Sequence, residues 1–240
     1  LEKPLELTHI VEMQRRLHLQ LFAWLKNVVL LRSSKSDATK SDDGILILAC
    51  GALAHEIQAI IKANQWGRQF DLKCLSPELH NSPELIAPKL AEKIKYWKSR
   101  YSEIFVAYGD CGSKGEIDRL LQSEKIERIP GAHCYEFFAG KHAFSKLSEE
   151  EPGTFYLTDF LTKNFERLVV KGLKLDQYPE LIEMFFGNYK RVVYLVQSSD
   201  PKLAELAAGI ADYLGLDFEE RISGYGDLER SLGQKIFATS

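Results

Sequence analysis

The chain has 240 residues, of which 45% are hydrophobic and 27% are charged, and its formal net charge at pH 7 is −3. This balance is typical of a globular protein with its own core, and it excludes a largely disordered chain. Because Lys and Arg are scattered rather than gathered in a basic stripe, we expect no binding to nucleic acid.

Residues 1–43 are predicted to form an N-terminal helical extension and a polar linker. Their apolar stretch, His18–Leu31, contains Lys26 and is shorter than the roughly 20 residues that a membrane-spanning helix needs. No small-residue cleavage site follows it, and Arg32–Asp43 is polar and rich in serine. We therefore expect an amphipathic helix with no membrane span and no chemistry of its own.

Residues 44–240 are predicted to form a single α/β domain, because strand-like apolar runs alternate with helical patterns. The first run, Ile45–Ala49, is continuously apolar, as in a parallel strand that is buried on both faces. Thr154–Leu168 begins as a strand and continues as a helix, and Pro179–Phe186 is a short helix candidate. The other strand candidates are Phe70–Leu75, Ile104–Tyr108, Ile126–Ile129, Arg191–Gln197 and Asp217–Ile222.

Helical patterns separate these strands. Apolar residues recur at helical spacing from Leu53, from Ile86, from Ile117 and from Leu203. Strands that alternate with helices form parallel sheets joined by right-handed crossovers. The predicted fold class is therefore a Rossmann-like α/β fold with one mainly parallel sheet and helices on both of its faces.

Three of the four cysteines follow predicted strands. Cys50 ends the first strand, Cys111 comes just after the third, and Cys134 comes after the fourth. Open parallel sheets bind ligands at the carboxyl ends of their strands, so we expect these three thiols to converge. Cys74 lies inside a predicted strand, where a cysteine is usually a small buried hydrophobe.

Three convergent thiolates suit zinc or an iron–sulfur cluster, because both favour sulfur ligands. Cys50, Cys111 and Cys134 would leave one coordination position open, or filled by His133 or a carboxylate. No CxxC pair is present, so two other roles stay open: plain core residues and a metal-free nucleophilic thiol. Few, widely spaced cysteines also indicate reduced thiols and a cytoplasmic location.

Glycines flank the cysteines at the points where strands give way to helices. Gly51, Gly109 and Gly112 would leave backbone amides exposed there, and such amides could hold a carboxylate or phosphate of a small-molecule ligand. Tight turns between a strand and a helix would account for the same glycines. Both explanations stay open, because no Walker or GxGxxG spacing exists.

Three titratable residues close to the cysteines are candidate catalytic groups. Glu56 opens the first helix, where it could accept a proton or simply complement the helix dipole. Asp110 precedes Cys111 in a turn, a position where Asp is common for structural reasons. His133 precedes Cys134 and could act as a base toward Cys111, since adjacent residues on extended backbone point apart.

Six segments of the chain form a distinctive set: ACGALAHE (49–56), LHNSPE (79–84), VAYGDCG (106–112), PGAHCYEFFAG (130–140), GTFYLTDFL (153–161) and FFGNYKRVVYL (185–195). Together they resemble an uncharacterised bacterial and archaeal family, domain of unknown function 1638, over about residues 44–225. The resemblance implies a cytoplasmic α/β protein. Many members are encoded near genes of corrinoid-dependent methyl transfer and one-carbon chemistry, and the family's cysteine-bearing motifs match Cys50, Cys111 and Cys134.

The leading hypothesis is a thiolate-bound metal or iron–sulfur protein that assists methyl or one-carbon transfer with a thiol or a corrinoid protein. A metal with an open position could deprotonate an incoming thiol, with Glu56 or Asp110 taking the proton. One alternative is a non-enzymatic module that binds an anionic metabolite. Another is a metal-free enzyme with Cys111 or Cys134 as nucleophile, so the sequence does not decide whether the protein is an enzyme.

Overall fold

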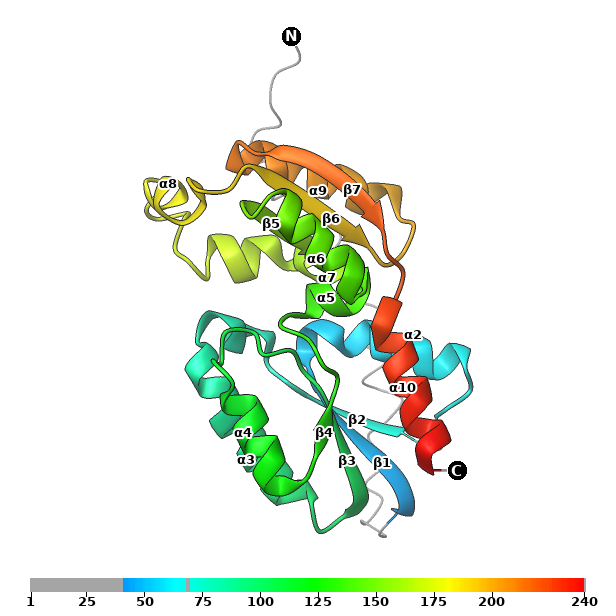
Figure 1. Cartoon of the computed structure of the whole chain (residues 1–240). Coiled ribbons are helices and arrows are strands. Elements are labelled where there is room, and N and C mark those ends of the chain that lie inside the picture. Colours follow the sequence, from blue (N-terminus) through cyan, green and yellow to red (C-terminus); the bar gives the residue numbers. More distant parts are fainter. Residues whose placement is uncertain (1–40, 68–69, 240) are drawn as a thin grey trace, which may run out of the picture. The chain divides into compact units, whose positions relative to one another are not determined.

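The computed structural model describes residues 41–67 and 70–239, and there the chain divides into two compact units. The first unit consists of residues 41–150 and 222–239, and the second unit of residues 151–221. Each unit has its own sheet, so the α/β class with parallel sheets is confirmed (Figure 1). The strands form two sheets, however, where we expected one.

The predicted N-terminal extension and linker, residues 1–43, lie outside the described residues except for residues 41–43, which open the first strand. None of the helices in the described part of the chain combines the length and hydrophobicity needed to cross a membrane.

Four parallel strands form the sheet of the first unit, in the order β2 (Phe70–Leu75), β1 (Ser41–Cys50), β3 (Tyr101–Ala107) and β4 (Glu127–Arg128). The continuous apolar run of β1 follows from its central position, because both of its faces are covered. Leu46, Ile47 and Leu48 are accordingly fully buried. The expected fourth strand is present but only two residues long.

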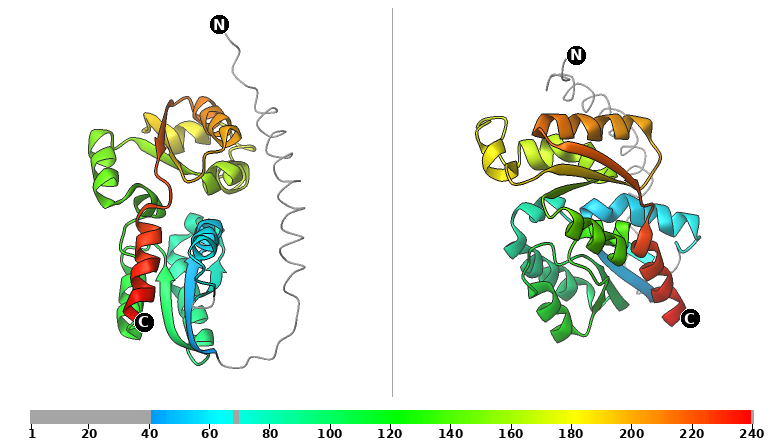
Figure 2. Two further views of the ribbon diagram at one scale, coloured as in Figure 1. Left: turned by 90° about the vertical axis from the view of Figure 1, so that its right-hand side faces the viewer. Right: turned by 45° about the horizontal axis from the view of Figure 1, so that its top comes forward.

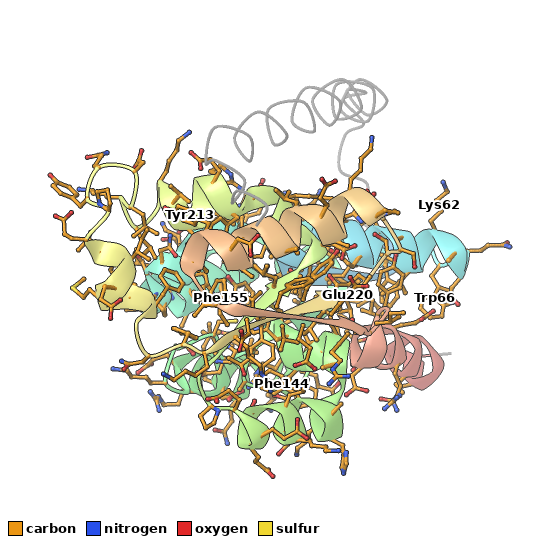
Figure 3. All side chains as sticks on the ribbon, turned by 90° about the horizontal axis from the view of Figure 1, so that it is seen from above. Lys62, Trp66, Phe144, Phe155, Tyr213 and Glu220 are labelled. Carbon is orange, nitrogen blue, oxygen red and sulfur yellow. The ribbon has the colours of Figure 1, made fainter. Side chains whose placement is uncertain are left out.

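The helical segments of the first unit are η1 (Gly51–Leu53), α2 (Ala54–Ala63), η2 (Pro77–Asn81), η3 (Pro83–Leu85), α3 (Ile86–Trp97), α4 (Glu116–Glu124), α5 (Cys134–Ala139), α6 (Lys141–Glu150) and α10 (Gly226–Thr239). The helices α3 and α4 pack on one face of the sheet, against Leu46 and Leu48. The helices α2 and α10 lie next to each other on the opposite face (Figure 2). A Cβ at Gly233 on α10 would lie 3.3 Å from the ring of Trp66, which follows the end of α2 and is labelled in Figure 3.

The second unit contains β5 (Thr154–Thr158), β6 (Arg191–Val196) and β7 (Asp217–Ile222) in that order, with α7 (Asp159–Phe165), the π-helix η4 (Glu166–Val170), α8 (Leu181–Phe186) and α9 (Pro201–Leu214). Its core joins α7 and α9 to β5 and β6. There the ring centroids of Phe155 and Phe165 lie 6.5 Å apart, and those of Phe165 and Tyr213 lie 6.1 Å apart. Figure 3 labels Phe155 and Tyr213.

The cap of α9 shows how local sequence sets the element boundaries of the second unit. The Asp200 carboxylate accepts a hydrogen bond from the Lys202 amide at 3.0 Å, and Pro201 opens the helix. Gly215, with φ at +69°, ends it. The sequence-predicted strand-to-helix segment Thr154–Leu168 corresponds to β5 and α7. Whether residues 44–240 fold as one domain stays a prediction.

Candidate functional site

The candidate site is the carboxyl edge of the sheet in the first unit. Cys50 is the last residue of β1, Cys111 lies in the loop after β3, and Cys134 is the first residue of α5, which follows β4. These strands are parallel, so all three residues stand at the same edge. Cys74 lies within the edge strand β2, paired with Ala49, and is exposed.

The strand register places Cys50 next to Tyr108. Ala49 is paired with Ala107, so Cys50 and Tyr108 leave β1 and β3 side by side and toward the same face. Tyr108 is only 1% exposed, and it packs in one core cluster with Cys50 and Cys111.

Two loops bring Cys111 close to Cys134. The Cys111 amide donates to the Ala132 carbonyl at 2.8 Å, and the Asp110 amide donates to the Gly131 carbonyl at 3.2 Å. With φ at +47°, Cys111 adopts a left-handed conformation that side chains rarely take, and these hydrogen bonds offset its cost.

The glycines next to the cysteines allow these loops to approach other parts of the chain. A Cβ at Gly109 would lie 2.9 Å from the Cα of His133, and a Cβ at Gly51 would lie 2.9 Å from the Leu75 carbonyl oxygen. Gly112 has φ at +86°, a conformation that favours glycine. The tight-turn explanation therefore accounts for all three positions, and a role for their amides in ligand binding stays a prediction.

Arg128, which no sequence motif indicates, links the ends of β3 and β4 through hydrogen bonds. Its guanidinium donates to the carbonyl oxygens of Tyr108 at 3.3 Å, Ile129 at 2.8 Å and Gly131 at 3.1 Å. It also forms two hydrogen bonds to the carboxylate of Asp118, at 2.6 and 2.8 Å. The rigid fork of donors suits this role. In the sequence, Arg128 is marked by its charge and by its place near the end of a predicted strand.

The three candidate ligands are thiols rather than thiolates at neutral pH. Desolvation of the sulfur raises the pKa of Cys50, of Cys111 and of Cys134. The charge of Cys50 raises the pKa of Cys111 further, to about 12, and Cys111 and Cys50 both act on Cys134. Burial raises the pKa of Tyr108 above its usual range, and all three cysteines add to the effect. The three residues stand at one sheet edge, and Cys50 packs against the core cluster that contains Cys111.

Glu56 is buried near the cysteines instead of standing exposed at the start of its helix. It lies in the first turn of α2 and is only 3% exposed. Its charge contributes to the raised pKa of Cys134. The Oε1 atom of Glu56 lies 3.9 Å from the Nδ1 atom of the exposed residue His55. Complementing a helix dipole does not require a buried carboxylate, so the geometry favours a role for Glu56 near the thiols.

Asp110 organises its own loop. Its carboxylate accepts hydrogen bonds from the Ser113 hydroxyl at 2.7 Å, the Gly115 amide at 2.8 Å and the Lys114 amide at 3.2 Å. Desolvation acts to raise the pKa of Asp110, but these hydrogen bonds hold the pKa below its usual value. A carboxylate engaged in this way is a weak proton acceptor, so the contacts support the turn explanation.

His133 has titratable neighbours other than the cysteines. Desolvation lowers its pKa, although Asp110 and Glu136 act to raise it, so the imidazole is neutral at pH 7. The exposed residue His80 is close enough to interact with it electrostatically. The Nδ1 atom of His133 is buried and has no hydrogen-bond partner among the described residues. A neutral imidazole can accept a proton or bind a metal ion.

The thiols do not form a ready coordination shell. Within residues 41–67 and 70–239, no group of three or more His, Cys, Asp or Glu side chains has an arrangement that could hold a metal ion. Cys50, Cys111 and Cys134 are free thiols. To bind an ion there, the side chains would need a different arrangement.

A buried polar network that the sequence analysis missed lies at the carboxyl edge of the sheet in the second unit. Asp159, only 3% exposed, accepts hydrogen bonds from the Tyr194 hydroxyl at 2.8 Å, the Gln197 amide at 3.1 Å and the Ser198 amide at 2.9 Å. The Asp159 amide in turn donates to the Gln197 side chain at 2.7 Å. These contacts join the ends of β5 and β6. The signal in the sequence was an Asp directly after a strand-like run.

A comparison with protein families gives one match. The family model described as protein of unknown function (DUF1638) matches residues 74–232, more than half of the chain. Cys111 and Cys134 lie inside the matched range, and Cys50 and Glu56 precede it. No curated protein and no solved structure matches the chain significantly. Any inference about function therefore depends on the residues of the chain itself.

Proposed function

This chain belongs to the DUF1638 family of proteins of unknown function, and from its own residues we propose that Cys50, Cys111 and Cys134 bind a soft metal ion or an iron–sulfur cluster. The observation that carries the proposal is the place of the three cysteines at the carboxyl edge of one parallel sheet, with Cys50 packed against the core cluster that contains Cys111. The three residues come from the end of β1, the loop after β3 and the start of α5. Zinc and iron–sulfur clusters both favour sulfur donors.

The raised pKa values also separate metal binding from nucleophilic catalysis by a free thiol. A thiol nucleophile needs a thiolate, and desolvation disfavours that form at Cys50, Cys111 and Cys134. A bound cation reverses this preference, because a coordinating thiol is deprotonated outright. Each sulfur releases its proton to solvent or to a nearby base as the metal–sulfur bond forms.

Glu56 is a better candidate than His133 for the fourth coordination position of the metal. It is buried, and its charge reaches Cys134. His133 has its electrostatic contacts with His80, Asp110 and Glu136 instead. A carboxylate ligand exchanges with water or substrate more readily than a fourth thiolate, so this site would keep the open character that reactive zinc sites have.

A metal with an exchangeable position would act as a Lewis acid toward an incoming thiol and would make it a nucleophile at neutral pH. This is the chemistry that assistance to methyl or one-carbon transfer requires. A corrinoid protein as partner, a small-molecule ligand and a cytoplasmic location remain predictions from the sequence and its resemblance.

The test is the metal content of protein purified without oxygen, measured by elemental analysis and visible absorption. Stoichiometric zinc in colourless protein would support a Lewis-acid site, and iron with sulfide and broad visible absorption would support a cluster. Changing Cys50, Cys111 or Cys134 to Ser should abolish metal retention, because each change removes one of three thiolate ligands.

Cys74→Ser is the matched control. Cys74 is exposed and is paired with Ala49 on β1, so its replacement should leave metal content unchanged. Equal metal content in all four Ser variants, or wild-type protein that takes up neither zinc nor iron, would contradict the proposal.

A further inference from the structure

We propose that this chain binds a second copy of itself head to tail, through an acidic surface on its second unit and a basic surface on its first. The acidic surface consists of Asp176, Tyr178, Glu180, Glu183, Met184 and Phe185. The basic surface consists of Lys73, Lys93, Tyr96, Trp97 and Arg100. The proposal goes beyond the proposed metal site and does not depend on it, because none of these residues is a candidate ligand.

The helix α8 has apolar side chains that its own unit leaves uncovered. Phe186 is buried in the core of the second unit, and Leu181 packs against that core. Met184 and Phe185 are nevertheless 65% and 41% exposed. Three of the seven exposed large hydrophobic residues in the described part of the chain lie within residues 178–185, at one end of the second unit (Figure 1). Such a concentration of exposed apolar side chains marks an interaction surface.

Carboxylates accompany these apolar side chains along the chain. Residues 176–186 contain three acidic residues and no basic one. Asp176, Glu180 and Glu183 are all exposed, and none forms an ion pair with a residue that the structure describes. A partner for this surface must therefore supply apolar area and positive charge together.

The end of α3 offers this combination. The Lys73 ammonium lies 5.4 Å from the centroid of the Trp97 ring, and the Arg100 guanidinium lies 5.1 Å from it. Arg100 also lies 4.3 Å from the centroid of the Tyr96 ring, which is 55% exposed. Stacking uses the flat face of the guanidinium and leaves the N–H donors in its plane available to a carboxylate.

Positive charge dominates this part of α3. Residues 89–100 contain five basic residues and one acidic residue. Two of the basic residues, Lys89 and Lys98, pair with nearby carboxylates. Lys93 is exposed, forms no ion pair within the described chain and stands one helical turn before Trp97. The basic surface therefore complements the acidic surface both in charge and in apolar content.

The distribution of charge also sets the kind of contact. Each surface repels a copy of itself and attracts the other surface, so two chains meet head to tail rather than symmetrically. One acidic and one basic surface stay open on such a pair, and further copies can add there. Salt screens exposed charges, so association should weaken as the ionic strength rises.

The first experiment measures the mass of the full chain by sedimentation equilibrium, at low and at high salt and up to about 1 mM, where even a weak contact is half formed. The wild type should associate at low salt and less at high salt. Reversing the charge of one surface, by Glu180→Lys with Glu183→Lys or by Lys93→Glu with Arg100→Glu, should weaken association at least roughly 10-fold, because like charges then meet. A monomeric wild type, or variants that associate as it does, would overturn the inference.

The two variants together test whether these surfaces pair with each other. Each variant keeps the surface that the other has lost, so their equimolar mixture should regain the association that neither shows alone. Glu205→Lys with Asp212→Lys is the matched control, because it makes the same change of charge at exposed positions of α9 and should associate as the wild type does. A mixture that stays monomeric would overturn the pairing.

If a variant fails to fold, the wild type alone allows the test. A carbodiimide joins a carboxylate to an amine only where the two are in contact. In a mixture of isotope-labelled and unlabelled chains, mass spectrometry should find Glu180 or Glu183 of one chain linked to Lys93 or Lys73 of another. Associated protein without these links would overturn the inference. Neither test involves metal binding, so its outcome is independent of the proposed function.

Discussion

Gly109 carries no side chain, and the meeting of the two cysteine-bearing loops depends on this. A Cβ there would lie 2.9 Å from the His133 Cα and 3.1 Å from its carbonyl carbon, and both are backbone atoms. We therefore expect Gly109→Ala to lower the free energy of unfolding by about 1–3 kcal/mol, as overpacking typically does. Urea denaturation followed by circular dichroism measures the change.

The control for this prediction is Gly67→Ala in the same unit, where nothing lies within 4 Å of the added Cβ. Its effect should stay within about 0.5 kcal/mol, as for other open surface positions. If Gly109→Ala proved as stable as Gly67→Ala, the loops would have to be further apart than the contacts at His133 indicate.

Residue identity alone indicated some members of the candidate site and not others. Cys50, Cys111 and Cys134 could be named because cysteine is rare and each follows a strand-like run. Tyr108 and Arg128 could not, because an aromatic residue ending an apolar run and an arginine near a strand end are ordinary in any α/β protein. Their contacts, not their types, set them apart.

Among the elements, β5 and β6 depend on the carboxylate of Asp159. Replacing it with Ala would leave the buried Tyr194 hydroxyl and the Gln197 amide without their acceptor, whereas the amide of the exposed residue Ser198 could bind water instead. Each unsatisfied buried donor costs roughly 1–3 kcal/mol, so loss of the acceptor for two of them in Asp159→Ala should lower the free energy of unfolding by about 2 kcal/mol or more. Thermal and urea unfolding measure the loss.

Asp212→Ala provides the comparison, because Asp212 lies exposed on α9 in the same unit. It should change the free energy of unfolding by no more than about 0.5 kcal/mol. A similarly small effect of Asp159→Ala would show that the network does not hold the ends of β5 and β6 together.

Local sequence pattern predicts where the strands lie but not how they pair. Runs such as Ile45–Ala49 and Arg191–Gln197 were recognisable as strands because continuous apolar sequence is typical of parallel strands covered on both sides. Which strands share a sheet was not recognisable. Pairing depends on contacts between residues far apart in the chain, and the two runs look alike in sequence although they belong to different sheets.

For the molecule as a whole, the proposed metal site draws on the first unit alone. Cys50, Cys111, Cys134 and Glu56 all lie within residues 41–150. We therefore predict that removing residues 1–40, which leaves β1 intact, does not change the metal content per chain. Elemental analysis of the full and shortened chains checks this, and loss of metal on shortening would show that the extension contributes to the site.

The sequence by itself determined the α/β class and the order of strands and helices, and it indicated the three cysteines as candidate site residues. These features are local, because the apolar pattern predicts which positions are buried and the end of an apolar run predicts the end of a strand. Only the tertiary structure decided that the strands form two sheets, that Glu56 is buried, that the Asp110 carboxylate binds its own turn and that Tyr108 packs with Cys50. The physical reason is that burial and hydrogen-bond partners at these positions come from loops and strands distant in sequence, whose pairing no local pattern encodes.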